Sequence, residues 1–122
     1  MKIDALFIQA SSPCCISTLN KFEASLESYY KKIGCSMITF VSCYALNDIE
    51  GLENLSMILD DEALLQETPP PVNVIASMLY GYRQHGQALF GHAILVDIDP
   101  ETGETKSLTS EQVTAVLDWL HS

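Results

Sequence analysis

The sequence predicts a single α+β domain in which two to three helices cover a small mixed or antiparallel sheet. The chain has 122 residues, the length of one ordinary domain, and 48% of them are hydrophobic while 18% are charged. Short apolar runs rich in β-formers alternate with stretches that have helical spacing. These patterns give the order β-α-β-(ββ)-α-β-β-α, with residues 1–122 forming one domain.

The N-terminal part predicts a strand, a helix and a second strand. Residues 2–10 form an apolar run with β-formers, which indicates a buried strand. Residues 17–34 place apolar side chains three and four positions apart, which predicts one amphipathic helix capped by Ser17 or Thr18. Residues 36–45 are β-branched and aromatic, which favours a strand.

Residues 46–71 are acidic and interrupted by turns. The stretch 56–65 predicts a short hairpin with Asp60, Asp61 and Glu62 near its turn. Three consecutive prolines close this region.

The C-terminal part predicts a helix, a strand hairpin and a final helix. A short helix at 72–82 has Pro71 near its first turn. Thr109 and Gln112 have the spacing of a capping box at the start of the last helix. The remaining expected elements are a loop at 82–87, a strand at 88–98, a turn at 99–104, a return strand at 105–108 and a helix at 109–122.

The net charge of -10 is unevenly distributed along the chain. Through Lys32 the balance is four bases minus three acids, or +1, and beyond it two bases face thirteen acids, or -11. This composition disfavours direct nucleic-acid binding, which needs clustered Lys and Arg. An acidic face suits a basic protein partner, and the alternative is that the acids only provide solubility. The candidate partner-binding acids are Asp60, Asp61, Glu62, Asp97 and Asp99.

Two adjacent cysteines, Cys14 and Cys15, stand where the first strand is expected to meet the first helix. A helix N-terminus lowers a thiol pKa, but redox enzymes place two residues between their cysteines. A phosphatase-type cysteine needs an arginine about six positions on, and Lys21 stands in that region. We therefore predict that both cysteines are structural residues that pack a βα turn.

The cysteines and the apolar runs also bear on the compartment. Reduced, mostly buried thiols fit a reducing environment better than a disulfide framework does. The N-terminal stretch lacks the features of a secretory signal, and the longest apolar runs are too short to span a bilayer. We expect a cytoplasmic protein without membrane association.

Motifs for metal, cofactor or catalytic chemistry are not apparent in the sequence. The three histidines form no paired motif with a cysteine, so we predict no metal site. Residues 97–104 resemble the start of a calcium loop, but Thr102 and Leu108 occupy its sixth and twelfth positions. No phosphate-binding loop, nucleophile elbow or zincin helix is present, so we predict no cofactor and no catalytic residue.

The stretch 79–87 gathers aromatic and basic side chains in a chain that is otherwise acidic. Its arginine can bind a carboxylate or phosphate, and its tyrosines can stack on a planar group. The alternative is a helix C-cap at Gly81, followed by a loop in which Arg83 pairs with a local acid. The candidate ligand-binding residues are Asn73, Tyr80, Tyr82, Arg83 and His85.

The C-terminal half resembles an uncharacterised family, domain of unknown function 3846. The similar stretches are DDEALLQETPPPVNVIASMLYG, LFGHAILVDID and TKSLTSEQVTAVL, within residues 55–120. The chain departs from the family pattern at Val72, which stands between the prolines and Asn73, and at His92, where Asp is usual. The matching positions are Pro70, Pro71, Asn73, Ala76, Tyr80, Gly81, Gly91, Leu108 and Thr109.

The resemblance implies an origin in phages, plasmids or conjugative elements of bacteria, and it implies no particular activity. Our first hypothesis is a non-catalytic accessory protein of such an element that binds a basic host protein. A defence antagonist that mimics the charge of DNA is one version of it. The second hypothesis is a small-ligand binder or enzyme that uses the Tyr80–His85 loop, and a homo-oligomer is compatible with both.

Overall fold

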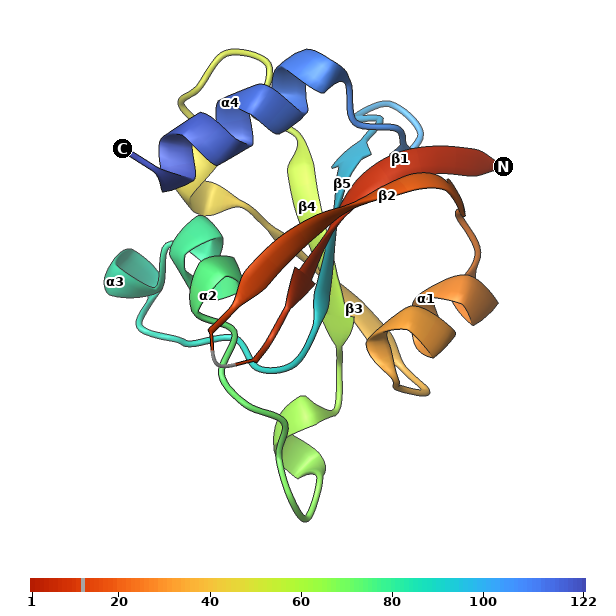
Figure 1. Cartoon of the computed structure of the whole chain (residues 1–122), viewed down its shortest axis with the longest axis vertical. Helices are drawn as coiled ribbons and strands as arrows, with labels where there is room; N and C mark the ends of the chain where they lie inside the picture. Colours follow the sequence, from red (N-terminus) through yellow and green to blue (C-terminus); the bar gives the residue numbers. More distant parts are fainter. Residues whose placement is uncertain (12) are drawn as a thin grey trace.

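The computed structural model describes residues 1–11 and 13–122, and it confirms the α+β class. Figure 1 shows helices on both sides of a central sheet. The elements are β1 (Lys2–Gln9), β2 (Cys15–Glu23), α1 (Leu26–Ile33), β3 (Ile38–Ser42), the 3-10 helix η1 (Tyr44–Leu46), β4 (Leu55–Asp60), the 3-10 helix η2 (Ala63–Leu65), α2 (Val74–Tyr80), α3 (Tyr82–His85), β5 (Ala93–Ile98), β6 (Thr105–Lys106) and α4 (Ser110–Leu120).

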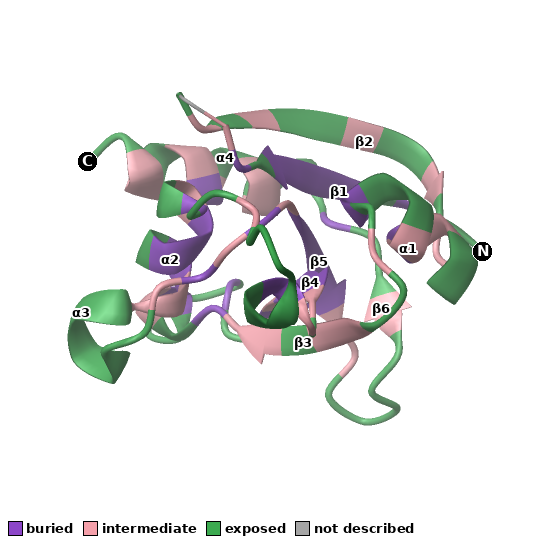
Figure 2. Ribbon diagram, turned by 90° about the horizontal axis from the view of Figure 1, so that it is seen from below, coloured by how far each residue is buried: buried purple, intermediate pink, exposed green. Residues whose placement is uncertain are grey.

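The sheet has the strand order β2-β1-β5-β4-β3, and β6 pairs with the end of β5. All of the strand pairs are antiparallel, so the antiparallel form of the prediction is the correct one. The most buried strands, β1, β4 and β5, lie in the middle, and β2 and β3 form the two edges. Figure 2 shows this contrast, with buried residues concentrated in the central strands.

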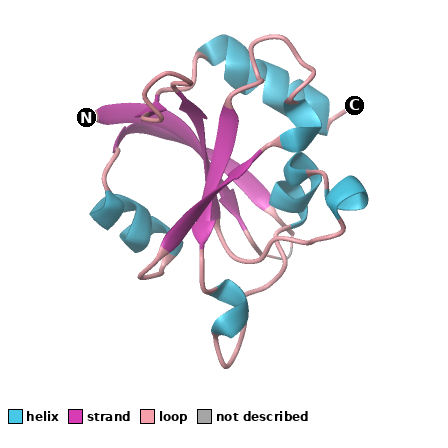
Figure 3. Ribbon diagram, turned by 180° about the vertical axis from the view of Figure 1, so that it is seen from behind, coloured by secondary structure: helices cyan, strands magenta, loops and turns pink. Residues whose placement is uncertain are grey.

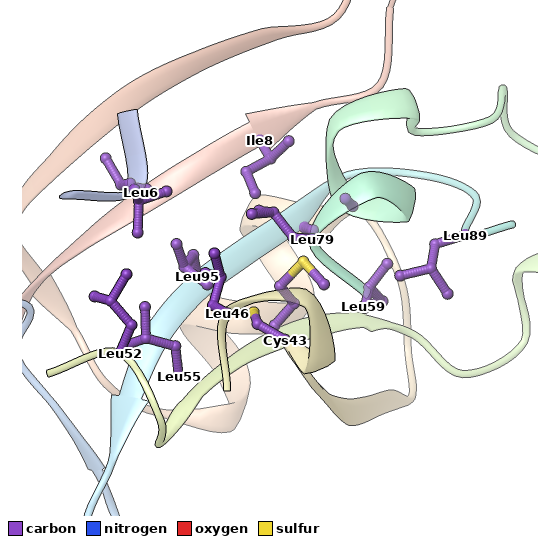
Figure 4. Close-up of a cluster of buried hydrophobic side chains, with 14 of the residues drawn as sticks. Leu6, Ile8, Cys43, Leu46, Leu52, Leu55, Leu59, Leu79, Leu89 and Leu95 are labelled. Carbon is purple, nitrogen blue, oxygen red and sulfur yellow. The ribbon is translucent and has the colours of Figure 1, made fainter. Parts of the chain in front are cut away.

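Each face of the sheet carries its own apolar core. On one face, α2, α4 and η1 cover Leu6 and Ile8 of β1 together with Leu95 of β5. Figure 4 shows Leu79 of α2 and Leu46 of η1 directed into this cluster. On the other face, Tyr29 and Ile33 of α1 cover the smaller cluster. Figure 3 shows α1 on the opposite side of the sheet from the other helices.

The helix expected over residues 17–34 is wrong in its first half, which forms β2. Ile3 pairs with Phe22 and Ala5 pairs with Leu19. Between these two pairs, β1 advances by two positions while β2 advances by three. This β-bulge places Leu19 and Phe22 on the same face, although they are three residues apart. The bulge therefore imitates helical spacing, and the helix starts only at the N-cap Ser25.

The hairpin expected within 56–65 is also wrong. Residues Leu55–Asp60 form β4, which pairs with β3 and β5, and the chain then enters η2 instead of a return strand. Both strands that pair with β4 lie outside the stretch 56–65. The turn residues Asp61 and Glu62 therefore mark the end of a central strand. The observed order therefore differs from the predicted one at this point and at β2.

The remaining C-terminal expectations hold with smaller changes. The capping box of Thr109 and Gln112 opens α4, and the turn at 99–104 connects β5 to β6. Asn73 is the N-cap of α2, so Pro71, expected near the first turn, lies two residues before the cap. The expected loop contains the one-turn helix α3.

Candidate functional site

A groove of about 460 Å³ lies beside the exposed side of α2 and α3. Val74 and Met78 lie one turn apart on α2, Tyr82 begins α3, and all three exposed side chains line the groove. Arg83 and Trp119 of α4 also line it, together with Ala45, Gly81 and Gln84. A tryptophan, a tyrosine and an arginine around an apolar floor can hold a planar anionic group or a partner side chain.

Tyr80 and His85 lie in a second cluster with Tyr44. The ring centroids of Tyr44 and His85 are 4.6 Å apart, and those of Tyr80 and His85 are 5.4 Å apart. The candidate residues of this loop are therefore split, because Tyr82 and Arg83 line the groove while the rings of Tyr80 and His85 pack against one another at a tilt. The contact of His85 with Tyr44 attaches α3 to η1.

Asn73 has a structural position in the core, with 0% of its surface exposed. Its side-chain nitrogen donates to the backbone oxygens of Ile8 at 3.0 Å and Gly91 at 2.9 Å. Its side-chain oxygen accepts the N–H of Ala76 at 2.9 Å, which caps α2. These bonds join β1 and the segment before β5 to α2. Both polar atoms of the Asn73 side chain are used in them, so neither is free to face the groove.

One part of the alternative stated for this loop, the helix C-cap at Gly81, is confirmed. Gly81 has φ +85°, the left-handed conformation that glycine adopts at a helix C-terminus, so it is the C-cap of α2. In the described parts of the chain, however, Arg83 has no carboxylate within the 4.0 Å of an ion pair. Its exposed guanidinium is therefore free to meet an anion from outside.

Acidic side chains concentrate at one end of the sheet, which we call the acidic end. Gln112 joins its parts, because its side-chain nitrogen donates to Gly51 at 2.9 Å and to the Asp97 carboxylate at 3.1 Å. The loop before β4, the β5–β6 turn and the start of α4 thus come together (Figure 1). Half of the sixteen acids of the chain lie here: Asp48, Glu50, Glu53, Asp97, Asp99, Glu101, Glu104 and Glu111.

The five candidate partner-binding acids do not form one acidic surface. Asp97 is only 7% exposed, and its carboxylate lies 3.8 Å from the Lys106 ammonium, so it acts within the fold. Asp99 lies in the adjacent turn, where its carboxylate accepts the N–H of Glu101. Asp60, Asp61 and Glu62 lie at the other end of β4, since Leu55 pairs with Asp97. Five strand residues separate the two ends by about 17 Å.

The adjacent cysteines lie at the β1–β2 connection, so the expected βα turn is wrong; Ser12 in this connection is outside the described residues. Cys14 is half-buried, and its thiol lies 3.6 Å from the side-chain oxygen of Asn73. Cys15 is exposed and lies 3.7 Å from the side-chain oxygen of Gln9. Cys15 therefore does not pack the core.

The other two thiols are held in their protonated form by burial. Burial raises the pKa of Cys43, which has 0% exposure, from 9.0 to about 12. Burial, and then the nearby Asp60 carboxylate, also raises the pKa of Cys35. Both effects disfavour the thiolate, so neither thiol is activated as a nucleophile.

Sequence reasoning missed Met78 and Trp119 of the groove and Tyr44 of the aromatic cluster. The four-residue spacing of Val74 and Met78 carried a usable signal, because it places two apolar side chains on one side of the predicted helix. Tyr44 and Trp119 carried none, because only the folded chain brings η1 and α4 to α2.

Neither a metal-binding cluster nor a membrane-spanning helix is present in the described residues. Within residues 1–11 and 13–122, no group of three or more His, Cys, Asp or Glu side chains is arranged to hold a metal ion. None of the helices described for this chain has both the length and the apolar character needed to cross a bilayer.

Comparison with known proteins gave one match. The family model described as domain of unknown function (DUF3846) matches residues 1–121, which extends the resemblance beyond the C-terminal half. No curated protein and no solved structure matches the chain.

Proposed function

The chain belongs to the domain of unknown function family DUF3846, and we propose that it is a non-catalytic protein whose acidic end binds a basic protein surface. The observation that carries this proposal is the concentration of eight acids around Lys106, whose ammonium is paired with Asp97. Six of the eight are exposed: Asp48, Glu50, Glu53, Glu101, Glu104 and Glu111.

Electrostatic reasoning supports binding over simple solubility. Solubility needs net charge but no particular placement, whereas here seven acids beyond the Asp97 ion pair share one end of the molecule. Like charges at close range repel, and a basic partner relieves this repulsion. Complementary charge also accelerates association, because it steers the two surfaces together before contact.

The biological setting that we propose is a phage or mobile element acting in the cytoplasm of its bacterial host, as the family resemblance implies. Antagonism of a host defence protein fits this setting. A duplex-like charge array is less well supported, because the acids form two groups about 17 Å apart along β4. A compact acidic end suits a local basic site on a protein better than a long DNA-binding channel.

The test uses two triple variants with the same change in charge. The first replaces Glu101, Glu104 and Glu111 with Gln at the acidic end, and the second replaces Glu27, Glu62 and Glu67, which lie outside the acidic end, with Gln. Immobilised wild-type and variant chains are exposed to bacterial lysate, and the retained proteins are identified by mass spectrometry.

We expect basic proteins that are retained at low salt, released at high salt and lost on the first variant only. Exposed charges are screened beyond about 8 Å at physiological ionic strength, so high salt weakens such an encounter. Retention that is independent of salt and equal on all three chains would contradict the role of the acidic end. Retention lost only on the second variant would move the binding surface to Glu27, Glu62 and Glu67.

A second candidate function is small-ligand binding in the groove at Arg83. The observation that favours it is the aromatic wall of Tyr82 and Trp119 beside an arginine without an ion pair in the described chain. Trp119 is the single tryptophan of the protein, so its fluorescence reports on the groove. Titration with planar carboxylates and nucleotides should change this fluorescence in the wild type and not in Arg83→Gln if the groove is a ligand site.

A further inference from the structure

The two edges of the sheet are built differently. The β2 edge contains the bulge, Lys21 and Glu23, which are features that prevent pairing with another strand. The β3 edge pairs with β4 in continuous register and contains no charged residue, proline or bulge. Figure 2 shows β3 as the outermost strand on its side of the sheet. This edge is open to pairing with another strand.

The hydrogen bonds identify which backbone groups of β3 are available. Asp61 donates its N–H to Met37, and Cys43 donates its N–H to Leu55. Hydrogen-bonded pairs alternate with non-bonded pairs in an antiparallel ladder, so the odd-numbered residues of β3 bond to β4. The outward N–H and C=O groups therefore belong to three even-numbered residues, which have no other hydrogen bond within the described chain: Ile38, Phe40 and Ser42.

A groove of about 350 Å³ runs along the same edge. Thr39 and Val41 of β3 form one wall, and Leu64 and Leu65 of η2 lie opposite them. Both leucines are exposed, so an apolar surface faces solvent beside the open strand. Asp61 lines this groove next to the N-terminal end of β3, and its exposed carboxylate has no ion pair in the described chain.

We propose that β3 accepts an extended segment of a partner protein as an additional antiparallel strand. The outward groups of Ile38, Phe40 and Ser42 bond to the backbone of this segment, and alternate apolar side chains enter the groove between Val41 and Leu65. Main-chain bonds supply affinity and the groove supplies specificity in such a strand addition. A Lys or Arg near the C-terminal end of the segment lies over Asp61.

Charge decides between a foreign segment and a second copy of this chain. Two copies each carry a net charge of -10 and repel one another, whereas a segment with a basic residue is attracted to Asp61. The proposal goes beyond binding at the acidic end, because it uses backbone pairing at a different part of the molecule. Either surface can fail its test without affecting the other.

The probe is a displayed library of random linear peptides of about ten residues, roughly twice the length of β3. Phe40→Pro removes an outward N–H without breaking a bond to β4, because proline is tolerated at such edge positions. Phe40→Val is the matched control, since it removes the same aromatic ring and keeps the N–H. Thermal unfolding of both variants verifies that the fold is retained.

We expect selected peptides to alternate apolar with other residues and to carry Lys or Arg at the C-terminal side. Their affinity for Phe40→Pro should be about tenfold lower than for Phe40→Val. When Asp61→Lys is the immobilised target, the selected peptides should lack the basic residue. When Glu67→Lys, outside the groove, is the target, the selected pattern should be the same as for the wild type. Amide hydrogen exchange at Ile38, Phe40 and Ser42 should slow when a selected peptide binds the wild type.

Three results would overturn the proposal. One is the absence of an alternating pattern, and another is equal binding to the proline and valine variants. The third is a dimer of the wild-type chain in sedimentation that Phe40→Pro abolishes, because a second copy would then be the occupant of the edge.

Discussion

Replacing Asn73 with Ala should destabilise the fold far more than the loss of an ordinary helix cap. Loss of an N-cap costs about 1 kcal/mol. Asn73 also satisfies the backbone oxygens of Ile8 and Gly91 in a fully buried position. Each buried acceptor left without a partner costs about 1–3 kcal/mol. The sum is about 3–7 kcal/mol, which is a large part of the roughly 5–15 kcal/mol that stabilises a domain.

The assay is denaturant unfolding of the wild type and two cap variants. Thr109→Ala is the matched control, because Thr109 caps α4 at an exposed position and its hydroxyl accepts only the N–H of Gln112 in the described chain. It should cost about 1 kcal/mol, so Asn73→Ala should cost at least about 2 kcal/mol more. Equal costs would refute the reasoning, because they would show that the bonds to Ile8 and Gly91 contribute nothing. A change in Trp119 fluorescence without loss of stability would instead favour a role for Asn73 near the groove.

Three other predictions concern the thiols and the bulge. In the native protein Cys15 should react rapidly with a thiol reagent, and Cys43 should react only on unfolding, because the first is exposed and the second is fully buried. Because the pKa of Cys43 is about 12 in the fold and 9.0 when unfolded, unfolding releases a proton between these values. Stability should therefore fall above about pH 9, by up to about 1.4 kcal/mol per pH unit relative to Cys43→Ala, and parallel pH profiles would contradict this. Lys21→Gly should raise the free energy of unfolding by about 1 kcal/mol, since Lys21 has φ +54° in the bulge; a loss of stability would show that its side chain matters more than backbone strain.

The parts of the fold that sequence reasoning predicted correctly are those governed by local patterns. The capping box at Thr109 and the glycine C-cap at Gly81 depend on residues within a few positions, and both are present. The α+β class and the buried strand at β5 follow from apolar runs that remain visible in isolation.

The errors arose where distant partners decide the structure. The bulge in β2 exists because β1 supplies the opposing strand, and the Asp4 carboxylate accepts the N–H of Lys21 there. Without that partner, the spacing of Leu19 and Phe22 is indistinguishable from helical spacing. The candidate residues of the 79–87 stretch separated for the same reason, since Tyr44 and Trp119 select which of them face one another.

The central claim is that the acidic end drives association with a basic partner. The most direct measurement is the association rate of the strongest partner from the lysate experiment, followed at increasing salt for the wild type and for the Glu101, Glu104 and Glu111 triple variant. We predict that the association rate of the wild type falls as the salt concentration rises. The variant should associate more slowly, and its rate should depend less on salt. Equal rates for the two proteins, unaffected by salt, would contradict the central claim and leave solubility as the role of these acids.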